Sequence, residues 1–362
     1  MVVAALVWPS AAFAQDAEAA DKAWRAGFKA FQDGNPRQCI TQMRAALKAA
    51  GEVYERWGWL RKTLGICLAQ RRQHDEAISE LQAAKELVSE DQDRFEVNHG
   101  LAQVYVARGN AGDYDRAIAS ENEAAKYASG SRRKALVAKT IGQAYYFKEN
   151  WRNAIEHLEQ SARSRSTDAD LAQKLGRAYL ESGNTGKAME WFQKTLSLDR
   201  NNTAAITNMG RLYLNEGKWT EAVRYLQQAV RADAQSMQVR NLLGRAYLGD
   251  RRYNDAITQL VQVVQSRSSD GGAHYNLGQA YQASGNDANA IESYTDALAY
   301  LVAGSTTRAD CLYDIGFVYE KVGRYDDALQ ALEDSAAIDA STKTTEAIAR
   351  VKVRISRQKS GS

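Results

Sequence analysis

Side chains that could carry out chemistry are scattered along this sequence and form no known catalytic motif. The chain has four histidines, namely His74, His99, His157 and His274. None has HExxH or paired-ligand spacing, and no GxSxG nucleophile elbow occurs. The glycines of residues 183–188 are too close together for a phosphate-binding loop, and Lys187 is followed by alanine. We therefore expect a non-enzymatic protein with no cofactor and no metal, in which residues 183–188 form a turn between helices.

The three cysteines are Cys39, Cys67 and Cys311, and no two of them form a CxxC pair suited to zinc or redox work. We expect them to be small buried residues. A disulfide between Cys39 and Cys67 is the alternative in an oxidising compartment, because the helices that carry them would be neighbours in a stacked array. Geometry has to decide between these two states.

The overall composition favours a folded and almost wholly helical chain. Hydrophobic residues make up 44% and charged residues 25%, both near the averages of globular proteins. Proline, which breaks helix interiors, occurs only at positions 9 and 36. Lysine and arginine number 47 against 44 acidic residues, an excess too small to predict a nucleic-acid or membrane partner from charge alone.

Residues 1–14 are predicted to be a signal peptide. An apolar run covers residues 2–8, and Ala12 and Ala14 are small residues two apart, as peptidase cleavage before Gln15 would require. No lysine or arginine precedes the apolar run, and a disordered alanine-rich leader is the alternative. We expect an exported protein, in the periplasm or another extracytoplasmic compartment of a bacterium.

A set of residues recurs every 34 positions in the middle of the chain. Four copies carry a bulky residue, a glycine and, three positions later, a tyrosine, and the four glycines are Gly176, Gly210, Gly244 and Gly278. An alanine follows twelve residues after each glycine, and a bulky residue follows four after that. A further glycine commonly lies seven residues after the first, where a left-handed helix cap is expected, as at Gly183, Gly217 and Gly285. Small residues at fixed spacing let two helices approach closely, so each copy is predicted to be a helix-turn-helix unit.

These residues resemble the signature of the tetratricopeptide repeat family. The family's proline near the end of the second helix is absent, and its first-helix tryptophan is replaced by Ala172, Ile206, Arg240 and His274. The resemblance implies an all-α fold, a right-handed superhelical solenoid of about nine repeats with a C-terminal capping helix. Within the array at 15–342, the repeats are expected near residues 20–53, 58–91, 95–131, 135–168, 169–202, 203–236, 237–270, 271–304 and 309–342.

In this family the first helix of each repeat lines a concave groove. By the resemblance, the residue after the first-helix glycine faces that groove, and it reads Gln103, Gln143, Arg177, Arg211, Arg245 and Gln279. The three arginines would form a row spaced by about 8–10 Å or somewhat more, the usual distance between packed helices. Flanking amides come from Gln173, Asn208, Asn241 and Asn276. Because guanidinium groups match carboxylates, the row could bind an acidic peptide or a chain terminus. The alternative is that these arginines are solvated or paired with acids such as Asp170 and Glu181.

Residues 343–362 are predicted to form the capping helix and a basic tail. Ala347, Ile348, Val351 and Ile355 keep helical spacing and would cover the last repeat. The stretch also carries six cations against Glu346, namely Lys343, Arg350, Lys352, Arg354, Arg357 and Lys359. Such a run can contact anionic lipid or cell-wall polymer, or it is simply a solvated helix face.

The sequence therefore predicts an exported scaffold that binds a peptide or protein partner in its groove. The alternative is a self-assembling structural component of the cell envelope or of a secretion assembly. Light scattering would separate these two functions, and the sequence leaves the oligomeric state open.

Overall fold

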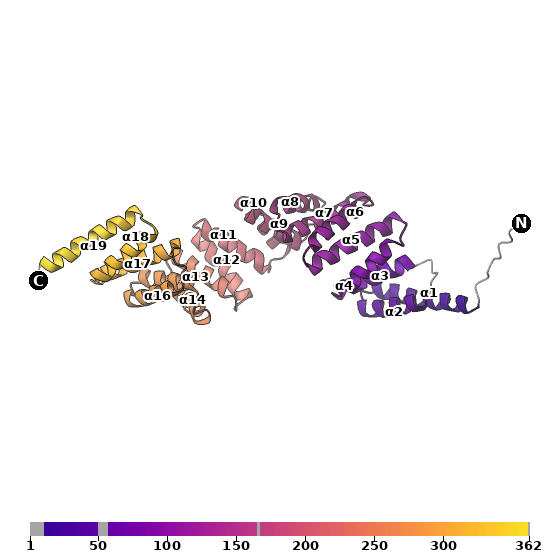
Figure 1. Cartoon of the computed structure of the whole chain (residues 1–362), viewed down its shortest axis with the longest axis horizontal. Coiled ribbons are helices and arrows are strands. Elements are labelled where there is room, and N and C mark those ends of the chain that lie inside the picture. The colour runs from indigo at the N-terminus through magenta and orange to yellow at the C-terminus, as the bar shows by residue number, and fades with distance from the viewer. Residues whose placement is uncertain (1–10, 50–56, 165–166, 361–362) are drawn as a thin grey trace. The chain divides into compact units, whose positions relative to one another are not determined.

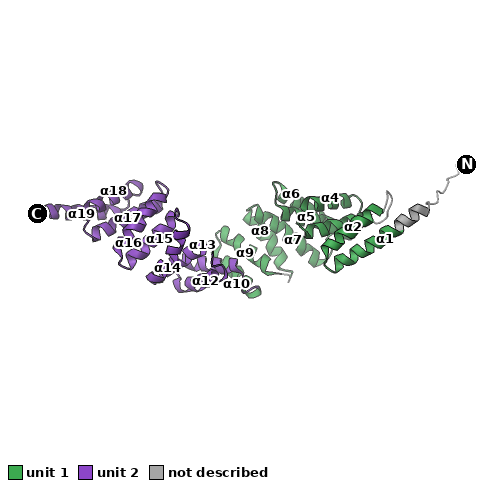
Figure 2. Cartoon of the chain, turned by 90° about the horizontal axis from the view of Figure 1, so that it is seen from below, with its two compact units in different colours: residues 1–198 green, residues 199–362 purple. Residues whose placement is uncertain are grey.

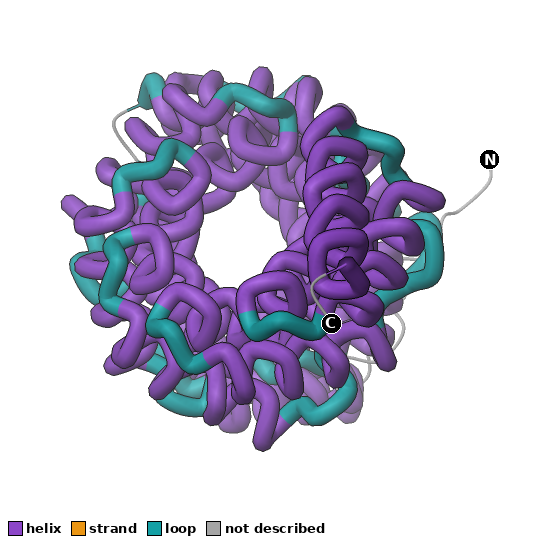
Figure 3. The backbone as a smooth tube through the Cα atoms, turned by 90° about the vertical axis from the view of Figure 1, so that its left-hand side faces the viewer, coloured by secondary structure: helices purple, strands orange, loops and turns teal. Residues whose placement is uncertain are grey.

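The computed structural model describes residues 11–49, 57–164 and 167–360, and each regular element in them is an α-helix (Figure 1). In chain order the helices are α1 (Ala11–Gln32), α2 (Pro36–Ala49), α3 (Trp57–Gln70), α4 (His74–Lys85), α5 (Asp91–Arg108), α6 (Asp113–Ala125), α7 (Gly130–Phe147), α8 (Trp151–Ala162), α9 (Ala169–Glu181), α10 (Thr185–Leu198), α11 (Thr203–Asn215), α12 (Trp219–Ala232), α13 (Met237–Gly249), α14 (Tyr253–Ser266), α15 (Gly271–Ala283), α16 (Asp287–Tyr300), α17 (Thr306–Lys321), α18 (Tyr325–Ile338) and α19 (Thr342–Ser360). Figure 3 shows these helices joined by loops, without a strand in the described residues. The prediction of an all-α helical repeat solenoid is confirmed.

The chain divides into two compact units, residues 1–198 and residues 199–362 (Figure 2). Unit 1 contains α1 to α10 and unit 2 contains α11 to α19. In each unit the helices pack as consecutive pairs, and the first helix of a pair also contacts the first helix of the next pair. Within the described residues, second helices do not contact one another in this way. The first helices therefore lie closer together and form the inner, concave side of each unit.

The first-helix glycine is required because a large side chain of the second helix occupies the space beside it. A Cβ atom on Gly210 would lie 2.6 Å from Cγ of Leu226, and one on Gly278 would lie 2.5 Å from Cδ1 of Tyr294. Leu226 and Tyr294 are fully buried. The predicted alternation of small and large residues is therefore the packing contact within each pair.

The turn between paired helices keeps a left-handed backbone even where glycine is absent. The predicted turn glycines have positive φ, as at Gly217 with 70° and Gly285 with 82°. Arg72, Glu149 and Arg251 occupy the same position in other repeats and also have positive φ, between 56° and 60°. Non-glycine residues rarely adopt this conformation, so the repeat geometry imposes it at these three turns. Gly183 has a φ of 83°, and residues 183–184 lie in the turn, whereas residues 185–188 of the segment form the first turn of α10.

All three cysteines are buried, as expected, and two of them are joined by a disulfide. Cys39 of α2 and Cys67 of α3 form a disulfide with a Cα to Cα distance of 6.4 Å. Both are fully buried, and Cys311 is a buried free thiol. Burial raises the pKa of the Cys311 thiol to about 12, so this cysteine is unreactive at neutral pH. The disulfide alternative is thus the observed state.

The structure describes only part of the expected signal peptide at the N-terminal end, whereas it describes the expected capping helix at the C-terminal end. Residues 1–10 of the expected signal peptide lie outside the described residues, and residues 11–14 form the first turn of α1. At the other end, Ala347 and Val351 of α19 are buried and pack with Ala328 and Leu332 of α18, as a capping helix should. None of the helices in the described residues has the length and apolar content needed to cross a bilayer.

Candidate partner-binding site

The three arginines of the predicted row have different surroundings. In unit 1, Arg177 of α9 is exposed, and its Nε lies 3.3 Å from Oε1 of Glu181. In unit 2, Arg211 of α11 donates from Nη2 to Oδ1 of Asn208 at 2.8 Å. Arg245 of α13 is exposed and makes no ion pair with a residue that the structure describes. Of the alternative states, Arg177 is paired with a nearby acid and Arg245 is exposed to solvent, so the binding role of the row stays a prediction.

The flanking amides are held by neighbouring helices. Asn276 of α15 donates to Oδ1 of Asn241 on α13 at 2.9 Å. Gln279 of α15 donates to the hydroxyl of Tyr275 at 2.9 Å, which orients its amide. In unit 1, Gln143 of α7 donates from Nε2 to Oδ2 of Asp170 at 3.3 Å. Gln173 lies half-buried on α9. The amides of unit 2 are thus fixed beside Arg245 by bonds within and between first helices.

A hollow of about 440 Å³ gathers part of the predicted site in unit 2. It is lined by Leu214, Asn215, Trp219, Arg245, Leu248, Gly249, Asn276 and Gln279. These residues come from α11, α12, α13 and α15, so three successive repeats contribute to it. Three of the predicted residues, Arg245, Asn276 and Gln279, therefore share one concave surface.

Trp219 is the aromatic member of this hollow and is one of the lining residues that the sequence did not predict as part of a binding site. Its indole lies over Gly249, where an added Cβ would come within 2.3 Å of the ring. The indole remains 37% exposed. Trp219 is the first residue of α12, and the sequence feature that marks its place in the hollow is the glycine thirty residues later. Other repeats carry Glu181, Asn215 or Ala283 at the position of Gly249.

Asp314 of α17 lies at the next first helix beyond Gln279. Its carboxylate accepts hydrogen bonds from Tyr275 at 3.0 Å and from Gln279 at 3.4 Å. Burial raises the pKa of Asp314 above its usual value, and burial near this carboxylate also raises the pKa of Tyr275. The concave surface of unit 2 therefore passes from a cationic part at Arg245 to an acidic part at Asp314.

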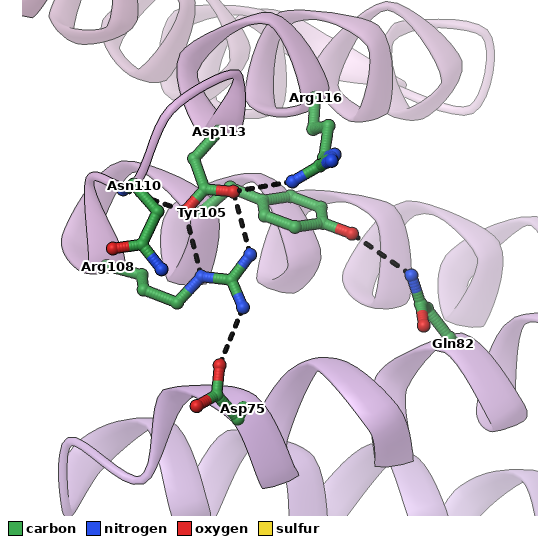
Figure 4. Close-up of polar contacts among 7 residues, drawn as sticks. All are labelled: Asp75, Gln82, Tyr105, Arg108, Asn110, Asp113 and Arg116. Carbon is green, nitrogen blue, oxygen red and sulfur yellow. Dashed lines mark hydrogen bonds and ion pairs between the residues drawn. The ribbon is translucent and has the colours of Figure 1, made fainter.

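A second polar cluster, in unit 1, has the opposite character (Figure 4). Arg108 donates from Nε and Nη2 to both oxygens of Asp113, at 2.8 and 2.7 Å, and from Nη1 to Asp75 at 2.6 Å. Arg116 and the backbone of Asn110 also donate to Asp113. These bonds, the strongest being those from Arg108, lower the pKa of the Asp113 carboxyl to about 2. The cluster ties the end of α5 to the starts of α4 and α6, and all three nitrogens of the Arg108 guanidinium are engaged by carboxylates within it.

The histidines form no metal site in the part of the chain that the structure describes, where His, Cys, Asp and Glu do not gather in groups of three or more. His99 contacts the fully buried Glu121, with Nδ1 and Oε1 2.5 Å apart. Burial raises the pKa of Glu121. His274 is buried, and its Nε2 lies 3.0 Å from the carbonyl of Ser268. These contacts hold helices together, and the absence of catalytic activity stays a prediction.

Stacked helix pairs with a polar concave surface define a helical repeat scaffold for protein–protein interaction. Family models described as tetratricopeptide repeat match residues 139–203, 207–271 and 271–341, together more than half of the chain. The chain belongs to the tetratricopeptide repeat family. No curated protein matches the sequence significantly.

Three solved structures are similar to this chain at low sequence identity. The C-terminal part of a TPR repeat-containing protein from Cytophaga hutchinsonii is 18% identical, with a TM-score of 0.53 over 69% of this chain and 99% of that one. A tetratricopeptide repeat protein from Parabacteroides merdae is 13% identical, with a TM-score of 0.48 over 72% and 99% of the two chains. MamA from Desulfovibrio magneticus is 19% identical, with a TM-score of 0.44 over 48% and 96%. Because the sequence identity is so low, the first of these structures supports the assignment of the fold and nothing about function.

Proposed function

We propose that this protein is an exported scaffold that binds an acidic segment of a partner protein on the concave surface of unit 2. The observation that carries this proposal is the hollow around Arg245. Its guanidinium has no ion-pair partner among the described residues and lies beside an exposed indole and two oriented amides. Arginine forms strong paired hydrogen bonds with carboxylates, and tryptophan offers a rigid apolar face. Both residue types dominate the energy of protein interfaces.

The remaining residues of the predicted row have supporting roles in this proposal. Asn276 and Gln279 would hydrogen-bond the partner's backbone, and Arg211 and Asn208 would extend the contact along α11. In unit 1, Gln143, Gln173 and Arg177 present a similar set on their own concave side. Because Arg177 already has a carboxylate beside it, we assign it a weaker contribution than Arg245.

A crosslinked pull-down from the source cells tests the site, with three variants compared with wild type. Arg245→Glu reverses the charge, and Gly249→Ala displaces Trp219 without changing any charge. Arg231→Glu is the matched control, because Arg231 is an exposed arginine on the second helix α12. We expect the first two variants to lose the partner and the control to keep it. An unchanged partner in Arg245→Glu would contradict the proposal.

Export to the periplasm or another extracytoplasmic compartment of a bacterium is the second part of the proposal. It is supported by the buried Cys39–Cys67 disulfide, since disulfides persist in oxidising compartments, and by the apolar run and cleavage spacing before Gln15. Mass spectrometry of the natural protein should find Gln15 as the first residue and one alkylatable thiol after denaturation. An intact residue 1 with three thiols would contradict export.

A further inference from the structure

Two adjoining hollows of about 520 and 720 Å³ lie at the C-terminal end of unit 2. Both are lined by Tyr325, Arg350 and Arg354, and they flank the capping helix α19. We call them together the C-terminal groove, which is defined by Phe317, Val322, Tyr325, Arg350, Val353 and Arg354. This groove is separate from the hollow at Arg245, with which it shares no lining residue.

The groove holds more cationic than anionic charge. Arg350 donates from Nε and Nη2 to the carboxylate of Glu320, at 3.0 and 2.8 Å, and Nε of Arg354 lies 2.9 Å from the same carboxylate. Glu320 is 7% exposed, and the hydrogen bonds from Arg350 lower its pKa, so this carboxylate is charged at neutral pH. Two guanidinium groups thus share one carboxylate. Each guanidinium group has five N–H donors, and the two together face a single carboxylate, so donors and one positive charge remain.

Apolar side chains surround these arginines and stay exposed. Phe317 and Val322 are each 43% exposed and Val353 is 49% exposed. Phe317 follows the first-helix glycine of α17, so it occupies the position that Arg245 and Gln279 occupy in earlier repeats. The groove therefore combines an uncompensated cation with apolar contact area, which neither a solvated helix face nor a structural ion pair requires.

Two other cations of α19 contact side chains outside the groove, whereas Arg357 also lines its 720 Å³ hollow. Nζ of Lys343 lies 3.7 Å from the centre of the Tyr313 ring, and Lys352 forms an ion pair with Glu333 at 2.9 Å. The excess charge is therefore concentrated in a recess between helices. A recess suits an extended chain that can enter it, whereas a flat lipid surface would need cations on an outward face.

We propose that the C-terminal groove is a second binding site, which takes a peptide segment in which acidic and apolar residues alternate. A carboxylate of the segment binds the free donors of Arg354 and Arg350, and an adjacent apolar side chain packs on Phe317 and Val353. The capping helix then has a role in binding as well as in covering the last repeat. The chemistry that selects the partner is the charge complementarity between this recess and a carboxylate.

Fluorescence anisotropy with the full chain tests this site. The probe is a fluorescein-labelled peptide of four Asp-Leu repeats, with a peptide of four Asn-Leu repeats as the uncharged comparison. Arg354→Gln removes one guanidinium while Arg350 continues to compensate Glu320. Lys352→Gln is the matched control on the same helix. Circular dichroism of each variant checks that the fold is kept.

We expect Arg354→Gln to weaken binding of the Asp-Leu peptide about tenfold, the loss of one charge-assisted contact, and Lys352→Gln to change it less than twofold. Phe317→Ser should weaken it by a smaller factor, and the Asn-Leu peptide should bind at least tenfold more weakly. Equal affinities for Arg354→Gln and Lys352→Gln would overturn the proposal. If only Arg245→Glu weakened binding of the Asp-Leu peptide, the proposal would also be overturned, and the result would support binding in the hollow at Arg245. Binding to phosphatidylglycerol vesicles with none to the peptide would show a lipid surface site instead.

Discussion

Arg108 in unit 1 and Arg245 in unit 2 are both arginines of first helices, but their surroundings are opposite. Arg108 lies between two carboxylates, one of them fully buried, and uses all three nitrogens on them (Figure 4). Arg245 lies in a hollow beside an exposed indole and has no ion-pair partner in the described residues. Residue type and helix therefore do not separate a structural arginine from a binding one, whereas the carboxylates within reach do.

Removing Asp113 should have the largest effect, because it leaves Arg108 and Arg116 without their buried partner. We expect Asp113→Ala to lower the free energy of unfolding of unit 1 by about 3 to 4 kcal/mol. Asp75→Ala is the control, since the Asp75 side chain is 86% exposed and its pair should contribute less than about 1 kcal/mol. Urea unfolding followed by circular dichroism measures both. Equal losses would show that burial does not distinguish the two carboxylates.

Reduction of the Cys39–Cys67 disulfide should destabilise unit 1 and leave the stability of unit 2 unchanged. The bond closes a loop with a sequence separation of 28, and its loss should cost unit 1 about 3 kcal/mol. Hydrogen exchange read by mass spectrometry should then be faster in α2 and α3 and unchanged in α13 to α16. Faster exchange of similar size in both units would mean that the bond's effect is not local.

Low pH should remove the contribution of the Asp113 carboxylate to the stability of unit 1. The folded pKa of this carboxyl, about 2, is below its ordinary value of 3.8. Its stabilisation is therefore complete above about pH 4 and is lost as pH falls towards 2. The stability difference between wild type and Asp113→Asn should narrow between pH 5 and pH 2. A difference that stays constant would contradict the ion-pair account.

The smallest stability change should come from the backbone at Arg251, just beyond the helix that carries Arg245. Its φ of 60° suits glycine, so Arg251→Gly should raise the melting temperature through a gain of about 0.5 to 1 kcal/mol. Arg231→Gly, inside α12, should lower it by about 1 kcal/mol. Changes of the same sign would argue that the left-handed turn carries no strain.

Features set by the 34-residue period could be predicted from the sequence. Gly210 and Leu226 occupy fixed positions within one repeat, so the helix pairs, the turns and the capping helix follow from spacing alone. Contacts between side chains of different repeats could not be predicted. The disulfide depends on how closely α2 and α3 approach, and the place of Trp219 depends on the missing side chain of Gly249 in the next repeat.

The 34-residue period likewise predicts the positions of the three arginines of the row, but not which of them is free to bind a partner. Arg177, Arg211 and Arg245 share one register, yet only the structure shows that Glu181 and Asn208 contact the first two. The sharing of Glu320 by two arginines also depends on how the capping helix packs on α17. The repeat spacing gives the position of each arginine, and the side chains that contact it decide whether its guanidinium is free to bind a partner.

Isothermal titration of the recovered partner against wild type, Arg245→Glu and Arg231→Glu tests the central claim most directly. If the hollow at Arg245 is the binding site, Arg245→Glu should bind at least tenfold more weakly while its melting temperature matches that of wild type, and Arg231→Glu should bind like wild type. Equal affinity of Arg245→Glu and wild type would contradict the claim.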